Sequence, residues 1–546
     1  MVMRLARMGS AHQTRLSFMR VLLRRLKRES WTFEQARFEI SAGGVGRAVY
    51  VAHGPAHSYS LVAFAHDLPD AQRSDRVIAE AWDATFALFD GVPDEADLER
   101  LERNVPLQEA GRITERELCL SRANRSGRLF AHVVDSLAEG RQPDAKMVAD
   151  VGYLMRTTAV YGSGKFGAAD REVIADRPEF AAPFQAEMLT VYLIRAFVMD
   201  LVEHLAASRA PDLAVPLDPD LRRSFSIGNS TGLGMAPFLV NHPVLLNNWI
   251  AAREEAVARV CALETASPVE VQAFNAVLGR AAANAALWKS EHGLQLEKLA
   301  DLRADLAALR SHVASSDLGA DRPWMRLIEW GQVHLGLEGQ EQLIALILEP
   351  YGDLVDDLAD AMSADEDTAF AIDGRMPVET LRRCLDDHYD WALGIDWTAD
   401  AANARAWYVS EEKLEPRLGQ RFDEPISEFE QPLSPGRDAA RLAVALRGWA
   451  PQALVAEFLL ALPEHRHIVR RVQIATKFPY AEIRDNTIDA GMLPIDMLRC
   501  KLAFFGAGRF DPRSDRWVRI NMYAGAPFPH ELAGFEDEAW AYGVRL

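Results

Sequence analysis

Side chains that could do chemistry gather in four segments where glycine, asparagine, basic and aromatic residues interrupt a helical pattern. These segments are residues 156–171, 222–248, 407–437 and 465–523. In the first segment, three glycines fall within six residues and Lys165 stands among them. Bare backbone amides and an ammonium group suit a carboxylate or phosphate, and we predict that Tyr161 and Lys165 transfer protons or bind the anion. The predicted anion ligands of this segment are Arg156, Ser163 and Arg171.

Two familiar motifs fail in the first segment. A P-loop requires GxxxxGK[ST], but Ala159 stands in place of the first glycine and Phe166 follows Lys165. Tyr161 and Lys165 have the YxxxK spacing of short-chain dehydrogenases, yet the glycine run at 43–46 precedes a strand-like stretch instead of a helix. A helix C-terminal turn with solvated charges is the alternative interpretation of this segment.

The second segment combines glycines with hydroxyl and amide side chains that could orient a polar ligand. We predict Asn229 and Ser230 as substrate ligands and His242 as a catalytic acid or base. Ser230 does not lie in a GxSxG motif, which argues against a serine hydrolase. The alternative is a long turn that leads into a helix beginning near Pro243.

The third and fourth segments are rich in arginine, lysine and aromatic residues. Arg421 in the third and Lys477 in the fourth are predicted to bind the anion, because guanidinium and ammonium groups bind carboxylates and phosphates. Acidic neighbours could instead neutralise these bases. His465 and His467 form an HxH pair, but no third ligand has a recognisable spacing, so no metal site is predicted.

Composition limits the class of protein. A net charge of −19 disfavours binding to nucleic acid or to an anionic membrane surface. Four scattered cysteines without a CxxC pair indicate a reducing, cytoplasmic setting. No apolar run reaches the roughly 20 residues of a membrane span. The basic leader, residues 1–30, includes an amphipathic stretch at 16–26 that suits docking to a membrane surface or to a partner, or else is loosely ordered.

Hydrophobic periodicity predicts a predominantly α-helical α+β protein. The expected strands are 38–41, 47–53, 58–67, 82–89 and 515–523. The expected helices are 115–139, 144–160, 184–208, 243–265, 268–289, 294–314, 323–335, 340–348, 378–393 and 436–462. The predicted units are a small antiparallel α+β domain (31–110), a helical body (111–395), a loop-rich candidate lid (396–440) and a mixed C-terminal segment (441–546).

Together these features predict a cytoplasmic enzyme that acts on a small carboxylate, phosphate or acyl-CoA compound. Proton abstraction beside a stabilised carbonyl needs no nucleophile motif, so lyase or isomerase chemistry is favoured. No residue pattern identifies a cofactor. One alternative is an oxidoreductase that uses a metal, haem or flavin, and another is a non-catalytic interaction protein. A leucine repeat at 294–313 would serve as a homo-oligomer seam or as an internal helix contact.

Overall fold

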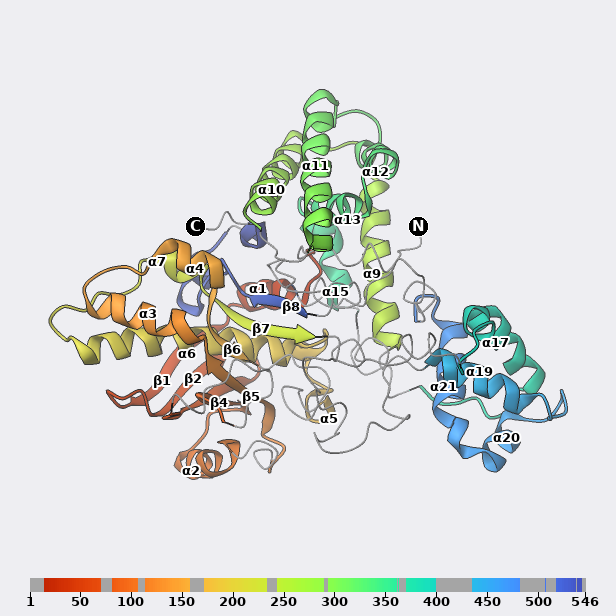
Figure 1. The fold of residues 1–546 in the computed structure, drawn as a ribbon, viewed down its shortest axis with the longest axis horizontal. Coiled ribbons are helices and arrows are strands. Elements are labelled where there is room, and N and C mark those ends of the chain that lie inside the picture. Colours follow the sequence, from red (N-terminus) through yellow and green to blue (C-terminus); the bar gives the residue numbers. More distant parts are fainter. Residues whose placement is uncertain are drawn as a thin grey trace.

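The structure is a computed structural model with three parts: a curved sheet with its helices, a layer of longer helices, and a small separate helical group (Figure 1). It describes residues 14–69, 81–106, 113–157, 171–232, 243–288, 293–360, 362, 370–398, 435–481, 506, 517–536 and 538–542. Most of the candidate lid therefore lies outside the described residues.

The sheet contains eight strands in sequence order. The strands are β1 (Thr32–Ile40), β2 (Gly46–His53), β3 (Ser58–Ala65), β4 (Ala84–Asp90), β5 (Glu117–Arg125), β6 (Tyr153–Thr157), β7 (Ser226–Gly232) and β8 (Trp517–Met522). Neighbouring strands are antiparallel except β6 and β7, which are parallel. The expected mixture of helices and strands is confirmed, but the expectation of a small antiparallel N-terminal sheet is wrong. The sheet extends across the chain because residues near the C-terminus supply its last strand.

Two helices predicted from periodicity are partly strands. The range 115–139 divides into β5 and α3 (Gly127–Ala138), and 144–160 divides into α4 (Ala145–Val151) and β6. Both misassigned strands carry apolar residues on consecutive positions, which gives a pattern like that of a buried helix. Gly152 adopts a left-handed conformation with φ of 77° and ends α4, so the chain can turn directly into β6.

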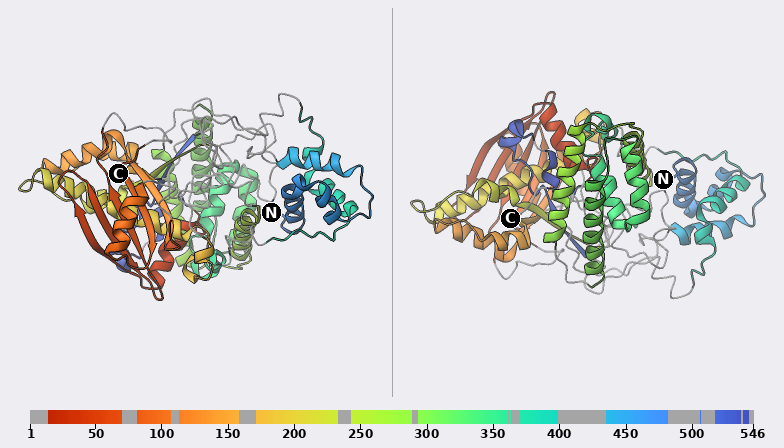
Figure 2. Two further views of the ribbon diagram at one scale, coloured as in Figure 1. Left: turned by 90° about the horizontal axis from the view of Figure 1, so that it is seen from below. Right: turned by 90° about the horizontal axis from the view of Figure 1, so that it is seen from above.

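Helix α6 (Gln185–Arg209) crosses one face of the sheet and contacts strands β2 to β7 (Figures 1 and 2). Its predicted range, 184–208, is confirmed. Apolar residues surround most of its circumference, so it is buried by the sheet on one side and by α1 (Phe18–Arg28) and α3 on others. The opposite face of β2 to β5 packs on α2 (Glu95–Asn104) through a smaller apolar cluster.

The basic helix α1 lies inside the fold. Arg20 is buried and donates two hydrogen bonds of 2.6 and 2.7 Å to Glu349. Arg15 makes a similar bidentate contact of 2.7 and 2.8 Å with Asp356, which Arg24 also approaches at 3.2 Å. These guanidinium groups are held by carboxylates of the same chain, so the basic character of α1 serves internal packing and not the predicted docking.

The longer helices form a layer beside the sheet (Figure 1). They are α9 (Pro243–Cys261), α10 (Pro268–Leu287), α11 (Gly293–Ser315), α12 (Pro323–His334) and α13 (Leu337–Ile347). Two short helices follow them, α14 (Gly352–Val355) and α15 (Asp357–Asp360). Leu302, Leu306 and Leu309 of α11 belong to the main apolar cluster, and α11 packs on α10 and α13. This leucine repeat is therefore an internal helix contact.

The separate helical group has its own apolar core. It contains α17 (Val378–Leu393), α19 (Pro435–Leu446), α20 (Val455–Ala461) and α21 (Arg466–Lys477), with a short 3₁₀ turn η6 (Pro463–His465). The predicted helix 436–462 is interrupted between α19 and α20, where Pro451 falls. The short elements that remain are α5 (Arg171–Ile174), η3 (Pro178–Phe180), α7 (Pro219–Ser224), η7 (Pro529–Gly534) and η8 (Glu538–Tyr542).

Arg195 of α6 fixes the ends of β7 and β8. Its buried guanidinium donates to the carbonyl oxygens of Phe225 at 2.7 Å, Arg223 at 2.9 Å and Ala526 at 2.9 Å. The guanidinium also lies 3.9 Å from the centre of the Phe528 ring. Burial lowers the pKa of Arg195 to about 9, which leaves it charged at neutral pH. One side chain thus joins the residues before β7 to those after β8.

We expect Arg195→Met to lower the free energy of unfolding by about 3–5 kcal/mol, because buried carbonyls that lose a donor cost about 1–3 kcal/mol each. Urea unfolding followed by circular dichroism measures this loss. The matched control is Arg209→Met, which removes an exposed pair with Asp135 and should change stability by less than about 1 kcal/mol. Equal effects of the two substitutions would contradict the role of Arg195.

Candidate functional site

Strands β6, β7 and β8 present polar residues on the sheet face opposite to α6. Side chains alternate between faces along a strand, and directly paired residues share a face. Ile227 and Met522 are paired and belong to the apolar core that α6 fills. The next pair, Gly228 and Asn521, therefore lies on the other face. Arg156 pairs with Gly228 and shares that face.

Strand β5 extends this surface, because Asn124 pairs with Arg156 and Arg122 lies two positions earlier on the same strand. We call this surface the polar face. Its members are Arg122, Asn124, Tyr153, Arg156, Gly228 and Asn521. Arg122 and Arg156 are partly buried, while Asn124, Tyr153 and Asn521 are buried. Two guanidinium groups and two amides on one sheltered surface can bind an anion and orient it.

A bulge in β6 sets the direction of Arg156. Tyr153 pairs with Ser226 and Arg156 pairs with Gly228, so three steps along β6 match two along β7. The extra residue lets Leu154 and Met155 both enter the apolar core, after which Arg156 returns to the polar face. Bulges beside functional sites commonly redirect a side chain in this way.

Gly228 is required by the Tyr153 ring. A Cβ atom at position 228 would lie 2.5 Å from Cγ and Cδ1 of Tyr153, much closer than real contacts allow. The ring therefore packs directly on the β7 backbone. The Tyr153 ring covers Gly228 at the centre of the polar face.

Asn521 is the least expected member of the polar face. Its side chain is fully buried, at 0% exposure, and neither amide atom has a hydrogen-bond partner within the described part of the chain. A buried amide without partners costs about 1–3 kcal/mol. Such a group commonly indicates a ligand or a bound water, because one amide offers both a donor and an acceptor.

Residues before β4 hold the edge of the polar face in place. Asn124 Oδ1 accepts from the backbone of Asp83 at 2.9 Å. The Arg122 guanidinium lies 4.0 Å from the centre of the Trp82 ring, a cation–π distance. Asp83 in turn accepts from the backbone of Arg125 at 2.9 Å. These contacts hold Asn124 and Arg122 against the residues that precede β4.

His66 lies on the same side of the sheet as the polar face. Its Nε2 lies 3.0 Å from Oγ1 of Thr85, and Thr85 pairs with Arg122. Burial lowers the pKa of His66, so the imidazole is neutral at pH 7 and able to exchange a proton. His66 directly follows β3, three strand spacings from Arg156 on β6, which is roughly 14 Å at the usual strand spacing.

Three of the predicted site residues lie on two adjacent strands, and two others lie on helices. Arg156, Asn229 and Ser230 lie on the adjacent strands β6 and β7. Arg171 begins the short helix α5. Lys477 ends α21, where its Nζ lies 5.0 Å from the centre of the Phe370 ring, outside the polar face. The predictions at Tyr161, Ser163, Lys165, His242 and Arg421 lie outside the described residues.

Strands β6 and β7 are parallel, so both end at the same edge of the sheet, at Thr157 and Gly232, and the antiparallel β8 begins there. In the sequence, Tyr161 follows Thr157 by four positions.

Several members of the polar face, and the nearby His66, were not predicted from the sequence. Arg122, Asn124 and His66 fall outside the four segments, and Asn521 was not singled out within the fourth. A strand assignment for 117–125 would have placed Arg122 and Asn124 on one face by their alternation. Nothing in the sequence indicates that Asn521 pairs with Gly228.

The two histidines of the HxH pair each contact a side chain of the separate helical group. His467 Nε2 lies 3.0 Å from Oδ2 of Asp438, and this hydrogen bond raises the pKa of His467. His465 stacks on Phe458 with ring centres 5.6 Å apart. Among the described residues, no group of three or more His, Cys, Asp or Glu side chains is arranged to hold a metal ion.

Comparison with known proteins finds no match to a protein-family profile, to a curated protein or to a solved structure. Among the helices that the structure describes, none has the length and apolar character needed to cross a membrane. The candidate site therefore stands on its own geometry.

We expect Gly228→Ala to destabilise the protein by about 1–3 kcal/mol, because the added methyl group meets the Tyr153 ring and overpacks the face. Thermal unfolding measures the effect. Tyr153→Ala removes the ring that the added methyl group would meet. In the Tyr153→Ala background, Gly228→Ala should therefore cause little further destabilisation. Gly127→Ala is the matched control, since nothing lies within 4 Å of its Cβ position. A loss that persists in the double variant would contradict the contact.

Proposed function

We propose that the polar face binds a small anionic metabolite and that the protein is a cytoplasmic enzyme of lyase or isomerase type. The observation that carries the proposal is the fully buried Asn521 amide, which has no hydrogen-bond partner among the residues that the structure describes and which is separated from Arg156 by Gly228 of β7. A carboxylate or phosphate oxygen would accept from Arg156 and from the Asn521 amide together. The remaining Asn521 oxygen could accept from a hydroxyl group of the same ligand.

Charge supports an anion as the ligand. The chain as a whole carries a net charge of −19, so an anion needs a local cluster of positive charge. Arg122 and Arg156 supply two guanidinium groups on adjacent strands. Both are partly buried, where an ionic hydrogen bond is stronger than in water.

Proton transfer is the second part of the proposal. Tyr161 and Lys165 follow the end of β6, and His242 follows β7 and precedes α9. Each strand leads to the same edge of the sheet, which supports one shared site for these groups. A base beside an anion bound at Arg156 would remove a proton next to a carbonyl group, and the bound cationic groups would stabilise the charge that develops.

The leading test is Asn521→Leu. Leucine has a similar size and no polar atoms, so without ligand we expect stability to stay equal or rise. Ligand stabilisation should be lost in the same variant. Differential scanning fluorimetry with inorganic phosphate, succinate and acetyl-CoA measures both quantities. A destabilised Asn521→Leu protein, or one that keeps the ligand response, would show that the amide has a structural role.

The second test is Arg156→Gln, which removes the charge but keeps a donor. We expect the affinity for the best of these three probes to fall at least about tenfold, because a charge-assisted hydrogen bond contributes about 1.5–3 kcal/mol. Isothermal titration calorimetry measures the affinity. Arg209→Gln is the control, since Arg209 lies on the exposed end of α6. If no probe binds the unmodified protein, or Arg156→Gln binds as tightly as it does, the proposal fails.

A further inference from the structure

We propose, on the basis of the anion binding proposed above, that the polar face takes an elongated ligand, an acyl thioester of coenzyme A, at two subsites. The second subsite is the indole N–H of Trp82, at the opposite end of the polar face from Asn521. Both side chains are buried. Neither Trp82 Nε1 nor the Asn521 amide has a hydrogen-bond partner within the described part of the chain.

One row of directly paired residues connects the two subsites. Asn124 of β5 pairs with Arg156 of β6, which pairs with Gly228 of β7. Gly228 pairs in turn with Asn521 of β8. Paired residues share a face of the sheet, so Asn124 and Asn521 mark the two ends of one row. Three strand spacings separate these ends, which is roughly 14 Å at the usual spacing.

Asn124 holds the backbone on both sides of Trp82. Its Oδ1 accepts from the backbone N–H of Asp83 at 2.9 Å, and its Nδ2 donates to the carbonyl oxygen of Ala81 at 3.4 Å. The Trp82 ring lies against the guanidinium of Arg122, which is 4.0 Å from the ring centre. Residues of the polar face therefore set the position of the Trp82 indole at the Asn124 end of the row.

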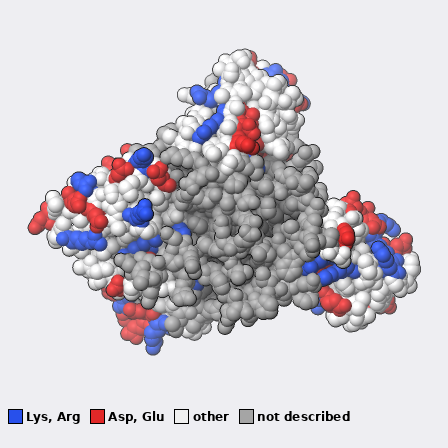
Figure 3. Space-filling model, in the orientation of Figure 1, with Lys and Arg blue, Asp and Glu red and all other residues white. Residues whose placement is uncertain are grey.

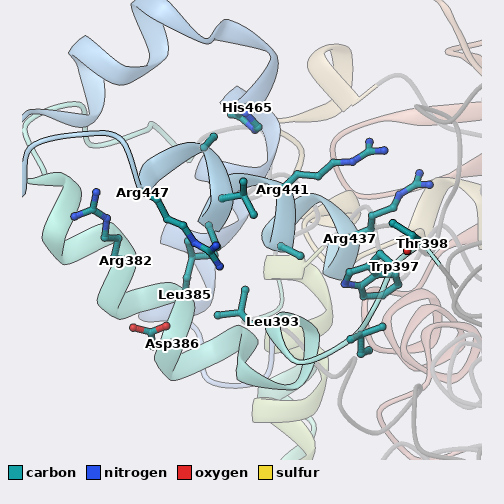
Figure 4. A pocket seen from close by; sticks show the side chains of 15 residues that line it. Arg382, Leu385, Asp386, Leu393, Trp397, Thr398, Arg437, Arg441, Arg447 and His465 are labelled. Carbon is teal, nitrogen blue, oxygen red and sulfur yellow. The ribbon is translucent and has the colours of Figure 1, made fainter.

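Two other indoles of this chain find an acceptor within the fold. Trp31 is as buried as Trp82, and its Nε1 donates to Glu29 at 2.9 Å. Trp397 lines a cleft of the separate helical group, yet its Nε1 donates to the carbonyl oxygen of Ala392 at 2.9 Å (Figure 4). Buried indole N–H groups usually have such a partner, so the acceptor that Trp82 lacks is one that a ligand would supply.

The two subsites require a ligand with acceptor atoms far apart. Asn521 can donate and accept, whereas Trp82 only donates, so the far end of the ligand must carry an acceptor oxygen. Succinate and inorganic phosphate are too short to span three strand spacings. A coenzyme A thioester carries carbonyl and phosphoryl oxygens along an extended arm. Its acyl end would lie at Arg156 and Asn521, where proton transfer is proposed, and its arm would reach Trp82.

Defined groups must select this ligand, because the visible surface offers no uniform charge. Lys and Arg side chains lie among Asp and Glu side chains on the visible lobes of the described protein (Figure 3). The chain as a whole carries a net charge of −19, which does not attract an anionic ligand. Hydrogen-bonding groups at fixed positions, such as the Trp82 N–H, would therefore distinguish a long ligand from a short one.

The experiment measures binding of acetyl-CoA, succinate and inorganic phosphate to the full-length protein and to Trp82→Phe by isothermal titration calorimetry. Phenylalanine keeps an aromatic ring against Arg122 and removes the N–H. We expect the unmodified protein to bind acetyl-CoA at least about tenfold more tightly than either small anion, and Trp82→Phe to lower the acetyl-CoA affinity about tenfold. Succinate and phosphate do not reach Trp82, so their affinities should be the same in the variant.

Trp31→Phe is the matched control, because Trp31 is equally buried but its N–H already has an acceptor in Glu29. It should leave the affinity for all three probes unchanged. Circular dichroism confirms that each variant is folded. The inference is overturned if acetyl-CoA binds no more tightly than succinate, if Trp82→Phe leaves the acetyl-CoA affinity unchanged, or if that variant weakens all three probes equally.

Failure of this inference can be told apart from failure of the proposed function. Succinate binding that is lost in Arg156→Gln, together with an acetyl-CoA affinity that is unchanged in Trp82→Phe, would leave the anion site without the second subsite. If none of the three probes binds the unmodified protein, both proposals fail.

Discussion

The buried guanidinium of Arg195 is the contact on which the far half of the sheet depends. Three carbonyl groups, before β7 and after β8, accept from this one side chain, and a charge in the core is tolerated because each of its three nitrogens donates a hydrogen bond. Without it, the ends of two strands from distant parts of the sequence would have unsatisfied carbonyls. The arrangement fixes β7 against β8, and that pairing places Asn521 opposite Gly228.

The polar face combines a closely packed backbone with a polar side chain whose burial lowers the stability of the fold. The Tyr153 ring holds β7 closely through Gly228, while the Asn521 amide is buried at a cost in free energy. Strain and unsatisfied groups of this kind concentrate at sites that bind ligands, where the ligand compensates for the cost. Strands position these side chains more accurately than loops could, which suits a site that must orient a small anion.

Basic residues serve different purposes in this acidic chain. Arg122 and Arg156 lie on adjacent strands of the polar face, whereas the buried Arg20 forms an ion pair with Glu349. A basic stretch in the sequence therefore does not by itself identify a binding surface, because the same residue type serves internal ion pairs and ligand sites.

The sequence by itself determined the elements with strong local periodicity, such as α6 and strands β2 and β3, because side-chain spacing and turn residues act over a few positions. It also indicated Arg156 and the 229–230 pair through glycine-rich local composition. Only the tertiary structure decided that β5 and β6 are strands, since apolar residues on both faces mimic a buried helix. The same holds for Asn521, because strand pairing between distant segments depends on packing against α6 and on the Arg195 contacts, which no local pattern records.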